Sequence, residues 1–206
     1  MTKALIIGGH GPVARMATAQ LVEAGVEVTS LIRTPAHEAD IRELGAEVIV
    51  QDLTDGEEWP AILVGFDVVA WAADHGEDAG ATQICALDRG GELAVISGLQ
   101  AMERPPYYLT VSHLGWDRPV PEDDDSSWTA YAKAKQAVGK RLASSHLDYT
   151  ILAPARLTDG PAGAYEHVEN SREAAEATTS RELLAQVLAE FVQAPAQSGT
   201  YAFIDA

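Results

Sequence analysis

Cysteine is almost absent from this chain, since Cys85 is the only one among 206 residues. A single thiol cannot form an internal disulfide, and no Cys or His cluster has the spacing of metal ligands. We therefore expect neither a disulfide scaffold nor a metal site. Cys85 lies in Ala81–Leu87, an apolar stretch with helical spacing. This pattern predicts a buried structural thiol rather than a nucleophile.

Positive charge is also scarce. The chain has 14 Lys and Arg residues against 31 Asp and Glu residues, which gives a formal net charge of −17. Phosphate binding needs clustered Lys and Arg, so we expect no nucleic acid and no membrane as partner. Long apolar runs are missing as well, since none reaches the roughly 18 residues of a membrane span. The apolar stretch near the N-terminus, Ala4–Ile7, is too short for a signal peptide. These absences predict a cytoplasmic protein.

Short β-branched runs alternate with stretches of helical periodicity along the whole chain. This alternation predicts a single doubly wound α/β domain over residues 1–206, with a mainly parallel sheet of about seven strands and helices on both faces. The expected strands are Lys3–Ile7, Val26–Ile32, Ala46–Val50, Asp67–Ala72, Tyr107–Ser112, Asp148–Leu152 and Thr200–Ile204. The expected helices are Val13–Ala24, Ala36–Leu44, Glu57–Leu63, Ala81–Ala101, Trp128–Ser144 and Glu182–Val192.

Two stretches between these elements stand out. Glu122–Ser127 is polar and acidic, and its Asp and Ser residues are expected to cap the helix that starts at Trp128. Pro154–Thr179 lacks strong periodicity, is rich in Gly, Pro and Ala, and is too long for an ordinary connection. It follows the sixth strand, and ligands of such folds bind beyond the carboxyl ends of the strands. We therefore expect a mobile substrate-side lid, with Tyr165 and His167 available to a planar substrate.

The first strand runs into a glycine-rich turn. Gly9-His10-Gly11-Pro12-Val13-Ala14 matches the G-x-G-x-x-G/A pattern, and it lies between a predicted strand and a predicted helix, as that pattern requires. Glycines allow a tight turn and close approach of the backbone to a pyrophosphate, and the helix N-terminus offers free N–H groups. The cofactor-binding residues expected here are Gly8, Gly9, Gly11, Pro12, Val13 and Ala14.

The end of the second strand usually decides between NAD and NADP, because an acid there holds the ribose 2′-hydroxyl. This chain has Arg33 at that point and no carboxylate. An arginine suits a 2′-phosphate, so we expect NADP(H) as the cofactor; a solvated surface arginine is the alternative. By position alone, Asp52 and Leu53 are expected to flank adenine. Ala72 and Ala73 are expected to let the backbone approach the cofactor.

Several runs of this sequence resemble the atypical short-chain dehydrogenase/reductase group, in its NmrA-like or NAD(P)H-binding branch. The resemblance covers nearly the whole chain, and the runs that carry it are Ile6–Arg15, Leu31–Pro35, Gly45–Thr54, Thr110–Gly115 and Leu147–Thr158. The stretch from Gly160 to Tyr165 is similar to the flavin reductases of this group. The resemblance implies a seven-stranded Rossmann sheet and NADP binding, with Pro154 among the cofactor-binding residues.

A Tyr-x-x-x-Lys motif occurs between the fifth and sixth strands, where the family has one. Tyr131 and Lys135 are four residues apart and share a helix face. Lys135 is expected to lower the pKa of Tyr131 and to hold the nicotinamide ribose, which leaves Tyr131 as general acid or base. The alternative is an exposed lysine beside a packed tyrosine.

The stretch after the fifth strand departs from the family pattern. The family typically has Val-Ser-Ser-Leu-Gly there, and this chain has Ser112 followed by His113. If the second serine is the functional one, His113 replaces it and is a candidate hydrogen-bond donor or proton relay. The alternative is a histidine that lines the cleft without a chemical role. Ser112, His113, Tyr131 and Lys135 are therefore the candidate catalytic residues.

Two functions agree with this pattern. The first is an NADPH-dependent reductase of a small planar or carbonyl acceptor, such as a quinone, flavin or aldehyde, with the cofactor supplying the hydride. The second is a non-catalytic NADP(H) sensor that binds a partner protein. A sugar epimerase or dehydratase is disfavoured, because the larger C-terminal substrate domain of such enzymes is missing. We expect a small-molecule substrate and a monomer or homodimer.

Overall fold

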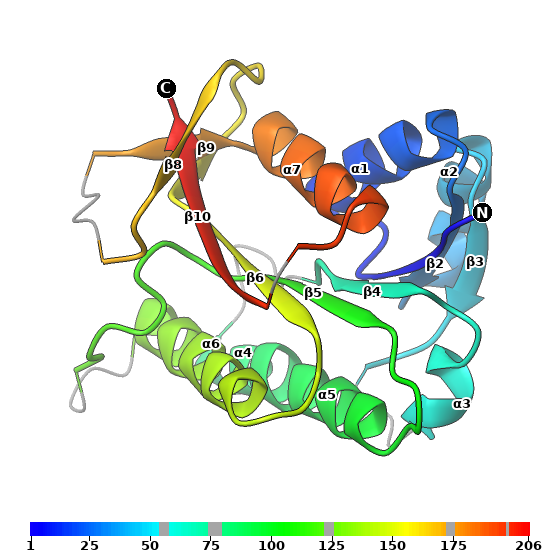
Figure 1. Cartoon of the computed structure of the whole chain (residues 1–206), viewed down its shortest axis with the longest axis horizontal. Helices are drawn as coiled ribbons and strands as arrows, with labels where there is room; N and C mark the ends of the chain where they lie inside the picture. The colour runs from blue at the N-terminus through cyan, green and yellow to red at the C-terminus, as the bar shows by residue number, and fades with distance from the viewer. Residues whose placement is uncertain (54–57, 74–79, 122–125, 172–175, 197) are drawn as a thin grey trace.

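Eight strands of the described chain form the central sheet, in the order β3-β2-β1-β4-β5-β6-β10-β8 (Figure 1). The computed structural model describes residues 1–206 apart from 54–57, 74–79, 122–125, 172–175 and 197. Neighbouring strands are parallel, except that β8 is antiparallel to β10. The strands are β1 (Lys3–Ile7), β2 (Glu27–Ile32), β3 (Glu47–Val50), β4 (Val68–Trp71), β5 (Tyr107–Val111), β6 (Tyr149–Pro154), β8 (Tyr165–Val168) and β10 (Gly199–Asp205). The predicted Rossmann fold is confirmed, with eight strands in the main sheet rather than about seven.

Strand β4 is apolar throughout, and β1 is apolar after Lys3, since helices cover both faces of the sheet. In β1, Ala4 and Ile6 pack into the core on one side, whereas Leu5 and Ile7 pack into the core on the other. All four residues are fully buried. Continuous burial of this kind is typical of parallel sheets, and it explains why β1 has no alternation of polar and apolar residues.

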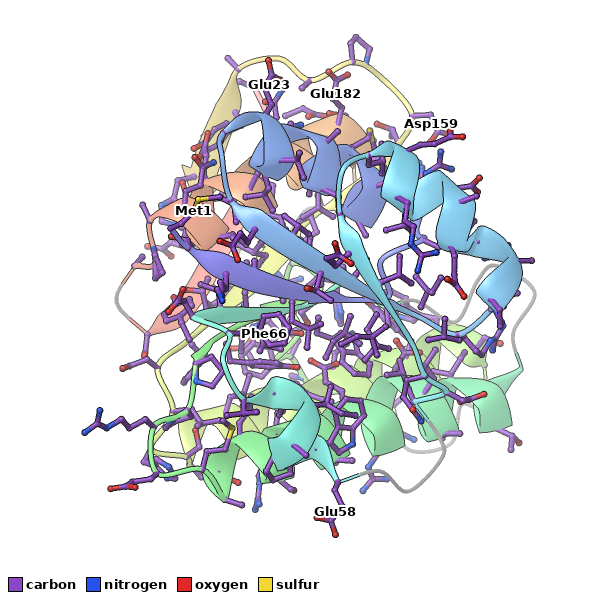
Figure 2. The ribbon with its side chains drawn as sticks, turned by 90° about the vertical axis from the view of Figure 1, so that its right-hand side faces the viewer. Met1, Glu23, Glu58, Phe66, Asp159 and Glu182 are labelled. Carbon is purple, nitrogen blue, oxygen red and sulfur yellow. The ribbon has the colours of Figure 1, made fainter. Side chains whose placement is uncertain are left out.

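The helices form two layers. On one face lie α1 (Pro12–Glu23), α2 (Glu38–Glu43) and α7 (Arg181–Gln193), and on the other lie α3 (Trp59–Leu63), α5 (Glu92–Gln100) and α6 (Ser127–Ala143). A 3₁₀ turn, η1 (Pro35–His37), precedes α2. Figure 2 views the sheet from the side of β3, with Glu182 of α7 and Glu58, just before α3, on opposite sides of it. This three-layer arrangement leaves the carboxyl ends of the parallel strands at one edge of the sheet.

The long helix predicted for 81–101 is present but irregular. It consists of α4 (Ala81–Ile84), a π-helical segment η2 (Cys85–Gly91) and α5. The prediction of a buried thiol is wrong, because Cys85 is exposed. It opens the π-helical segment, whose wider turns change which residues face the core. Asp88 and Gly91 are buried in this segment, and Ile84 is buried just before it.

The stretch predicted as an irregular lid, 154–179, contains regular structure. It includes β8 and the strands β7 (Arg156–Thr158) and β9 (Thr178–Ser180), which pair with each other in a second sheet. Two bonds attach the turn after β7 to the start of α7. Arg181 forms an ion pair with Asp159 at 2.7 Å, and the Ala162 N–H donates to Glu182 at 3.1 Å. Figure 2 shows Asp159 on the same side of the sheet as Glu182.

The predicted cap of α6 is confirmed in part. The Ser126 hydroxyl accepts a hydrogen bond from the Thr129 N–H at 3.1 Å, as an N-cap residue does. The acidic residues 122–125 lie outside the described residues. Within the described part of the chain, no helix combines the length and the apolar character that crossing a membrane requires.

Candidate cofactor and acceptor site

The turn between β1 and α1 lies across the carboxyl end of β2. The N–H groups of Gly8 and Gly9 both donate to the carbonyl oxygen of Leu31, each at 3.0 Å. Gly8 has a φ of +84°, and a Cβ there would lie 2.3 Å from the Cα of Ala73. A Cβ on Gly9 would lie 2.4 Å from the Cβ of Ser30. Both positions require glycine, because the turn approaches its neighbours too closely for any side chain.

Helix α1 presents an uncapped N-terminus at this turn. Gly11 is the N-cap, and the first intrahelical hydrogen bond runs from the Arg15 N–H to the Gly11 carbonyl at 2.9 Å. Pro12 has no N–H, and those of Val13 and Ala14 have no carbonyl acceptor within the helix. Two N–H groups and the positive end of the helix dipole therefore form a site suited to a phosphate.

The space beside Gly11 is open among the described residues. A Cβ added to Gly11 would meet only the carbonyl oxygens of Gly8, at 3.4 Å, and Ala72, at 3.9 Å. The third small residue of the motif, Ala14, is fully buried and packs into the core beneath α1. The residues of the turn thus fit a dinucleotide pyrophosphate: an open backbone surface above, and close helix–sheet packing below.

The other predicted cofactor residues follow the ends of neighbouring strands. Arg33 is exposed after β2, Asp52 and Leu53 are half-buried after β3, and Ala72 and Ala73 are half-buried after β4. Strand β1 pairs with both β2 and β4, so the strand order changes direction at β1. Ligands of doubly wound sheets bind at this point. The fold therefore brings these residues to the edge of the sheet at which the glycine turn lies.

Ser112 and His113 follow β5 at the same edge. The Ser112 N–H donates to the Leu152 carbonyl, and the Leu114 N–H donates to the Pro154 carbonyl, both at 2.8 Å. These bonds fix the segment against the end of β6. Ser112 Oγ and His113 Nδ1 are both buried and have no hydrogen-bond partner among the described residues. Buried polar atoms are normally satisfied, so these two atoms are candidates for contact with a ligand.

The environment of His113 keeps its imidazole neutral. Burial, followed by the positive charges of Lys135 and Arg118, lowers the pKa of His113 from its ordinary 6.5 to about 4. Near neutral pH, His113 therefore has one N–H donor and one acceptor nitrogen. Such a group can donate a hydrogen bond, but it does not act as a cationic acid.

Three aromatic rings meet beside Ser112. The His113 ring centroid lies 4.9 Å from that of Trp128 and 5.4 Å from that of Tyr131, and the Trp128 and Tyr131 centroids are 5.7 Å apart. We call these residues the aromatic triad. His113 and Tyr131 are partly buried, whereas Trp128 is 59% exposed. A large exposed ring beside two candidate catalytic groups offers a planar molecule a surface on which to stack.

Lys135 is directed into the protein. Its Nζ lies 3.0 Å from the Glu92 carboxylate, and the two side chains are 2% and 0% exposed. The same carboxylate accepts hydrogen bonds from the hydroxyls of Tyr108, at 3.1 Å, and Thr110. Nζ lies 5.8 Å from the centre of the Tyr131 ring. Glu92 therefore sits at the centre of a buried polar network formed by α5, β5 and α6.

Burial and ion pairing have opposite effects on the pKa values of Glu92 and Lys135. Burial raises the pKa of Glu92, although Lys135 and the hydrogen bonds oppose that effect. Burial lowers the pKa of Lys135, but the nearby Glu92, Tyr131 and Asp88 outweigh this effect and together raise its pKa above the ordinary value. Lys135 is therefore an ammonium group whose charge is largely compensated by Glu92.

The family model described as NAD(P)H-binding matches residues 8–195. The chain belongs to this NAD(P)H-binding family. Among curated proteins, the UPF0659 protein C216.03 of Schizosaccharomyces pombe is 27% identical over 182 residues, covering 77% of this chain and 72% of that protein. The photosystem II assembly factor Ycf39 of Synechocystis is 26% identical over 164 residues, which span 79% of this chain but only 47% of Ycf39.

Solved structures share the fold of this NAD(P)H-binding protein over its full length. A Bacillus halodurans protein described as an NAD-dependent epimerase/dehydratase is 25% identical, with a TM-score of 0.85 and coverage of 100% of this chain and 95% of the other. ChuY, an anaerobilin reductase from Escherichia coli O157:H7, is 22% identical with a TM-score of 0.75, covering 99% and 97%. SP1627 of Streptococcus pneumoniae, described as an NADH-flavin reductase, is 19% identical with a TM-score of 0.77, covering 100% of both chains.

Two residues of this site were not predicted from the sequence. Glu92 lies three, four and seven residues before Val95, Ile96 and Leu99, all of which are buried. That spacing places a carboxylate on the apolar face of a helix, and it was the available signal for a buried ion pair. The sequence marks Trp128 only as the start of a predicted helix. No local pattern distinguishes an exposed tryptophan at a site from one at an ordinary surface.

Proposed function

We propose that this protein is an NADPH-dependent reductase that transfers a hydride to a small planar acceptor of the quinone or flavin type. The observation that carries the proposal is the aromatic triad of His113, Trp128 and Tyr131. His113 follows the end of β5, and Trp128 and Tyr131 lie on α6. Strand β5 is next to β4, beside the point where the strand order changes direction and where ligands of such sheets bind. Trp128 extends into solvent and can cover an acceptor that stacks against the cofactor.

The cofactor assignment rests on the glycine turn and Arg33. The N–H groups of Val13 and Ala14, which have no acceptor within α1, suit the pyrophosphate, and the exposed Arg33 guanidinium suits a 2′-phosphate through a forked contact. Asp52 follows β3 at the same edge of the sheet, where we place the adenosine half. When bound, NADPH supplies the hydride, and the protein supplies orientation and exclusion of water.

The environment of the candidate acid–base groups favours quinones and flavins over aldehydes. Reduction of an aldehyde places negative charge on one oxygen, which needs a strong proton donor nearby. Here the Lys135 charge is compensated by Glu92, and His113 is neutral. A quinone or flavin that accepts a hydride spreads the resulting negative charge over a conjugated ring and takes the one proton that completes the reduction from water. The reductase names of the anaerobilin and flavin neighbours support the same reaction class.

The test is an NADPH-oxidation screen with soluble quinones, free flavins and aldehydes under anaerobic conditions. We expect turnover with at least one planar acceptor and little or none with simple aldehydes. Trp128→Ala should raise KM for the planar acceptor by about tenfold, the loss of one stacking contact, with unchanged NADPH affinity. Trp128→Phe should restore most of that loss.

Val64→Ala is the matched control, because Val64 is an exposed apolar residue, 66% exposed, at the end of α3. It should leave turnover unchanged. NADPH binding without oxidation by any acceptor would overturn the reductase proposal and favour the NADP(H) sensor. Turnover of aldehydes alone, unaffected by Trp128→Ala, would overturn the assignment of the acceptor.

A further inference from the structure

Asn170 joins two segments that are far apart in the sequence. It lies two residues after the end of β8 and is half-buried. Its Oδ1 accepts a hydrogen bond from the Gly115 N–H at 2.8 Å, and its Nδ2 donates to the Asp117 carboxylate at 2.7 Å. Both Gly115 and Asp117 belong to residues 113–118, the loop that follows β5, which we call the β5 loop. One side-chain amide therefore binds this loop through both of its ends.

Other contacts attach the later part of the β5 loop to α6 and β10. The Trp116 indole N–H donates to the Thr200 hydroxyl at 3.2 Å. The same ring packs so closely on α6 that a Cβ added to Gly139 would lie 2.0 Å from it. Gln136 of α6 donates to the Arg118 carbonyl. These contacts hold residues 116–118, whereas the Gly115 N–H is bound from the other side, by Asn170.

Gly115 is the point at which the β5 loop depends on Asn170. Gly115 is buried, and its N–H donates to Asn170 Oδ1. A buried N–H that loses its acceptor is unfavourable, so the loop would have to move to satisfy it. Gly115 follows His113 by two residues, and the Trp116 N–H donates to the His113 carbonyl at 3.1 Å. Movement at Gly115 would therefore shift His113 as well.

His113 carries this effect into the candidate site. Its ring lies 4.9 Å from that of Trp128 and 5.4 Å from that of Tyr131, measured between centroids. Its Nδ1 is buried and has no hydrogen-bond partner among the residues that the structure describes. A ring that a planar molecule stacks on, or a nitrogen that bonds to it, is effective only when its position is fixed, because small displacements of positioned groups are costly.

We propose that Asn170 is a positioning residue, which holds His113 where the planar acceptor requires it. The inference rests on the proposed function, because it presumes that the aromatic triad receives the acceptor. Asn170 acts through the β5 loop, and both of its hydrogen bonds described above go to that loop. The glycine turn is bound instead to Leu31 at the end of β2. Asn170 should therefore affect the acceptor and not the cofactor.

The first experiment removes both bonds with Asn170→Ala. Steady-state oxidation of NADPH is measured with menadione and with riboflavin as acceptors, and calorimetry measures the Kd of NADPH. We expect KM for the acceptor to rise about tenfold, the scale of one buried hydrogen bond. The value of kcat at saturating acceptor and the Kd of NADPH should each change by less than about twofold.

Ser171→Ala is the matched control for this substitution. The Ser171 carbonyl accepts from the Arg118 guanidinium at 2.7 Å, and alanine retains that carbonyl. The Ser171 hydroxyl bonds to Glu169 rather than to the β5 loop. Ser171→Ala should therefore leave KM, kcat and the Kd of NADPH as they are in the parent.

An exchange of the two side chains separates positioning from a general loss of stability. Asn170→Asp keeps an oxygen for the Gly115 N–H but places a second carboxylate against Asp117, so KM should rise as it does in Asn170→Ala. Adding Asp117→Asn supplies an amide that can donate to the new carboxylate. The double variant Asn170→Asp/Asp117→Asn should return KM to within about threefold of the parent value.

Hydrogen exchange of the β5 loop tests the structural step without turnover. The amides of 113–118 should exchange faster in Asn170→Ala than in the parent, and the double variant should restore the parent rates. Equal exchange rates in the parent and in Asn170→Ala would overturn the inference. Circular dichroism and Tm of each variant establish that the fold is retained.

The kinetic outcomes distinguish this inference from the proposed function. Turnover by the parent with a KM that Asn170→Ala leaves unchanged would overturn the inference and leave the reductase proposal intact. A lower Tm without a change in KM would give Asn170 a structural role alone, and a double variant that recovers no KM would rule out positioning through this contact. Absence of turnover in the parent with both acceptors would refute the reductase proposal, and this inference with it.

Discussion

Substitution of Glu92 by Gln tests the buried polar network beneath the candidate site. Glutamine keeps the size of the side chain and an oxygen that accepts from Tyr108 and Thr110, but it removes the negative charge. The Lys135 side chain, only 2% exposed, then loses its ion-pair partner at 3.0 Å. We expect Glu92→Gln to be strongly destabilising, because a buried charge without a partner is costly.

The expected loss of unfolding free energy is about 3–5 kcal/mol, the usual effect of breaking a buried ion pair. The buried Asp88 also attracts Lys135, which favours the lower end of that range. For a domain of this size, such a loss lowers Tm by about 6–20 °C. The exposed residue Glu103 provides the control, since Glu103→Gln should change stability by less than about 0.5 kcal/mol.

Urea and thermal unfolding of four proteins measure this effect: the parent, Glu92→Gln, Lys135→Met and the double variant. The double variant removes both charges, so it should recover a substantial part of the sum of the single losses. Additive effects of the two substitutions would show that the residues do not interact energetically. Loss of less than about 1 kcal/mol in Glu92→Gln would refute the reasoning that Lys135 depends on this carboxylate.

Three further predictions concern His113, the glycine turn and the stretch 159–168. The pKa of His113 is about 4 in the folded state, below its ordinary 6.5, so its contribution to stability is present above pH 6.5 and is lost as pH falls towards 4. Unfolding measurements across that range should show a loss of unfolding free energy of up to about 3 kcal/mol, and His113→Gln should remove this pH dependence. Gly8→Ala should abolish NADPH binding because its Cβ would overlap the Ala73 backbone, whereas Gly65→Ala, with a similar φ of +90° and open space, should retain it in a titration. In hydrogen exchange, the amides of 159–164 should exchange fast in the free protein and more slowly with NADPH and acceptor. The amides of Tyr165–Val168, in the strand that pairs with β10, should be protected in both states. Equal exchange rates in the two segments would contradict this prediction.

The sequence predicted the elements that carry a long repeating signal. Lys3–Ile7 is confirmed residue for residue as β1, and the helix predicted for 128–144 corresponds to α6 at 127–143. Apolar runs and helical periodicity identify such elements because each buries a whole face. The strands β7 and β9 have three residues each, which is too few for any period to be detected. Their stability comes from pairing with each other, a contact between segments about 20 residues apart.

The distinction between local sequence signals and contacts made by tertiary packing also applies to the candidate site. The glycine turn was predictable because its motif is local, and because Gly8 and Gly9 lie where a Cβ would overlap neighbouring residues. The partnership of Glu92 with Lys135 joins residues 43 positions apart, and the stacking of His10 on His37 depends on how the turn docks on β2. Such contacts are products of tertiary packing. Lys135 was predicted to serve Tyr131 and the ribose; its main partner among the described residues is Glu92, and its contact with the ribose stays a prediction.

The most direct test of the account is a single-turnover measurement with NADPH bound to the protein. Bound NADPH is mixed anaerobically with a quinone, and its absorbance is followed in the parent and in Trp128→Ala. We predict rapid oxidation in the parent, and in Trp128→Ala a rate lower by about tenfold at limiting quinone that is recovered at saturating quinone. Bound NADPH that stays reduced with every quinone and flavin, or oxidation at the same rate in both proteins at limiting quinone, would contradict the proposal that the aromatic triad receives a planar acceptor.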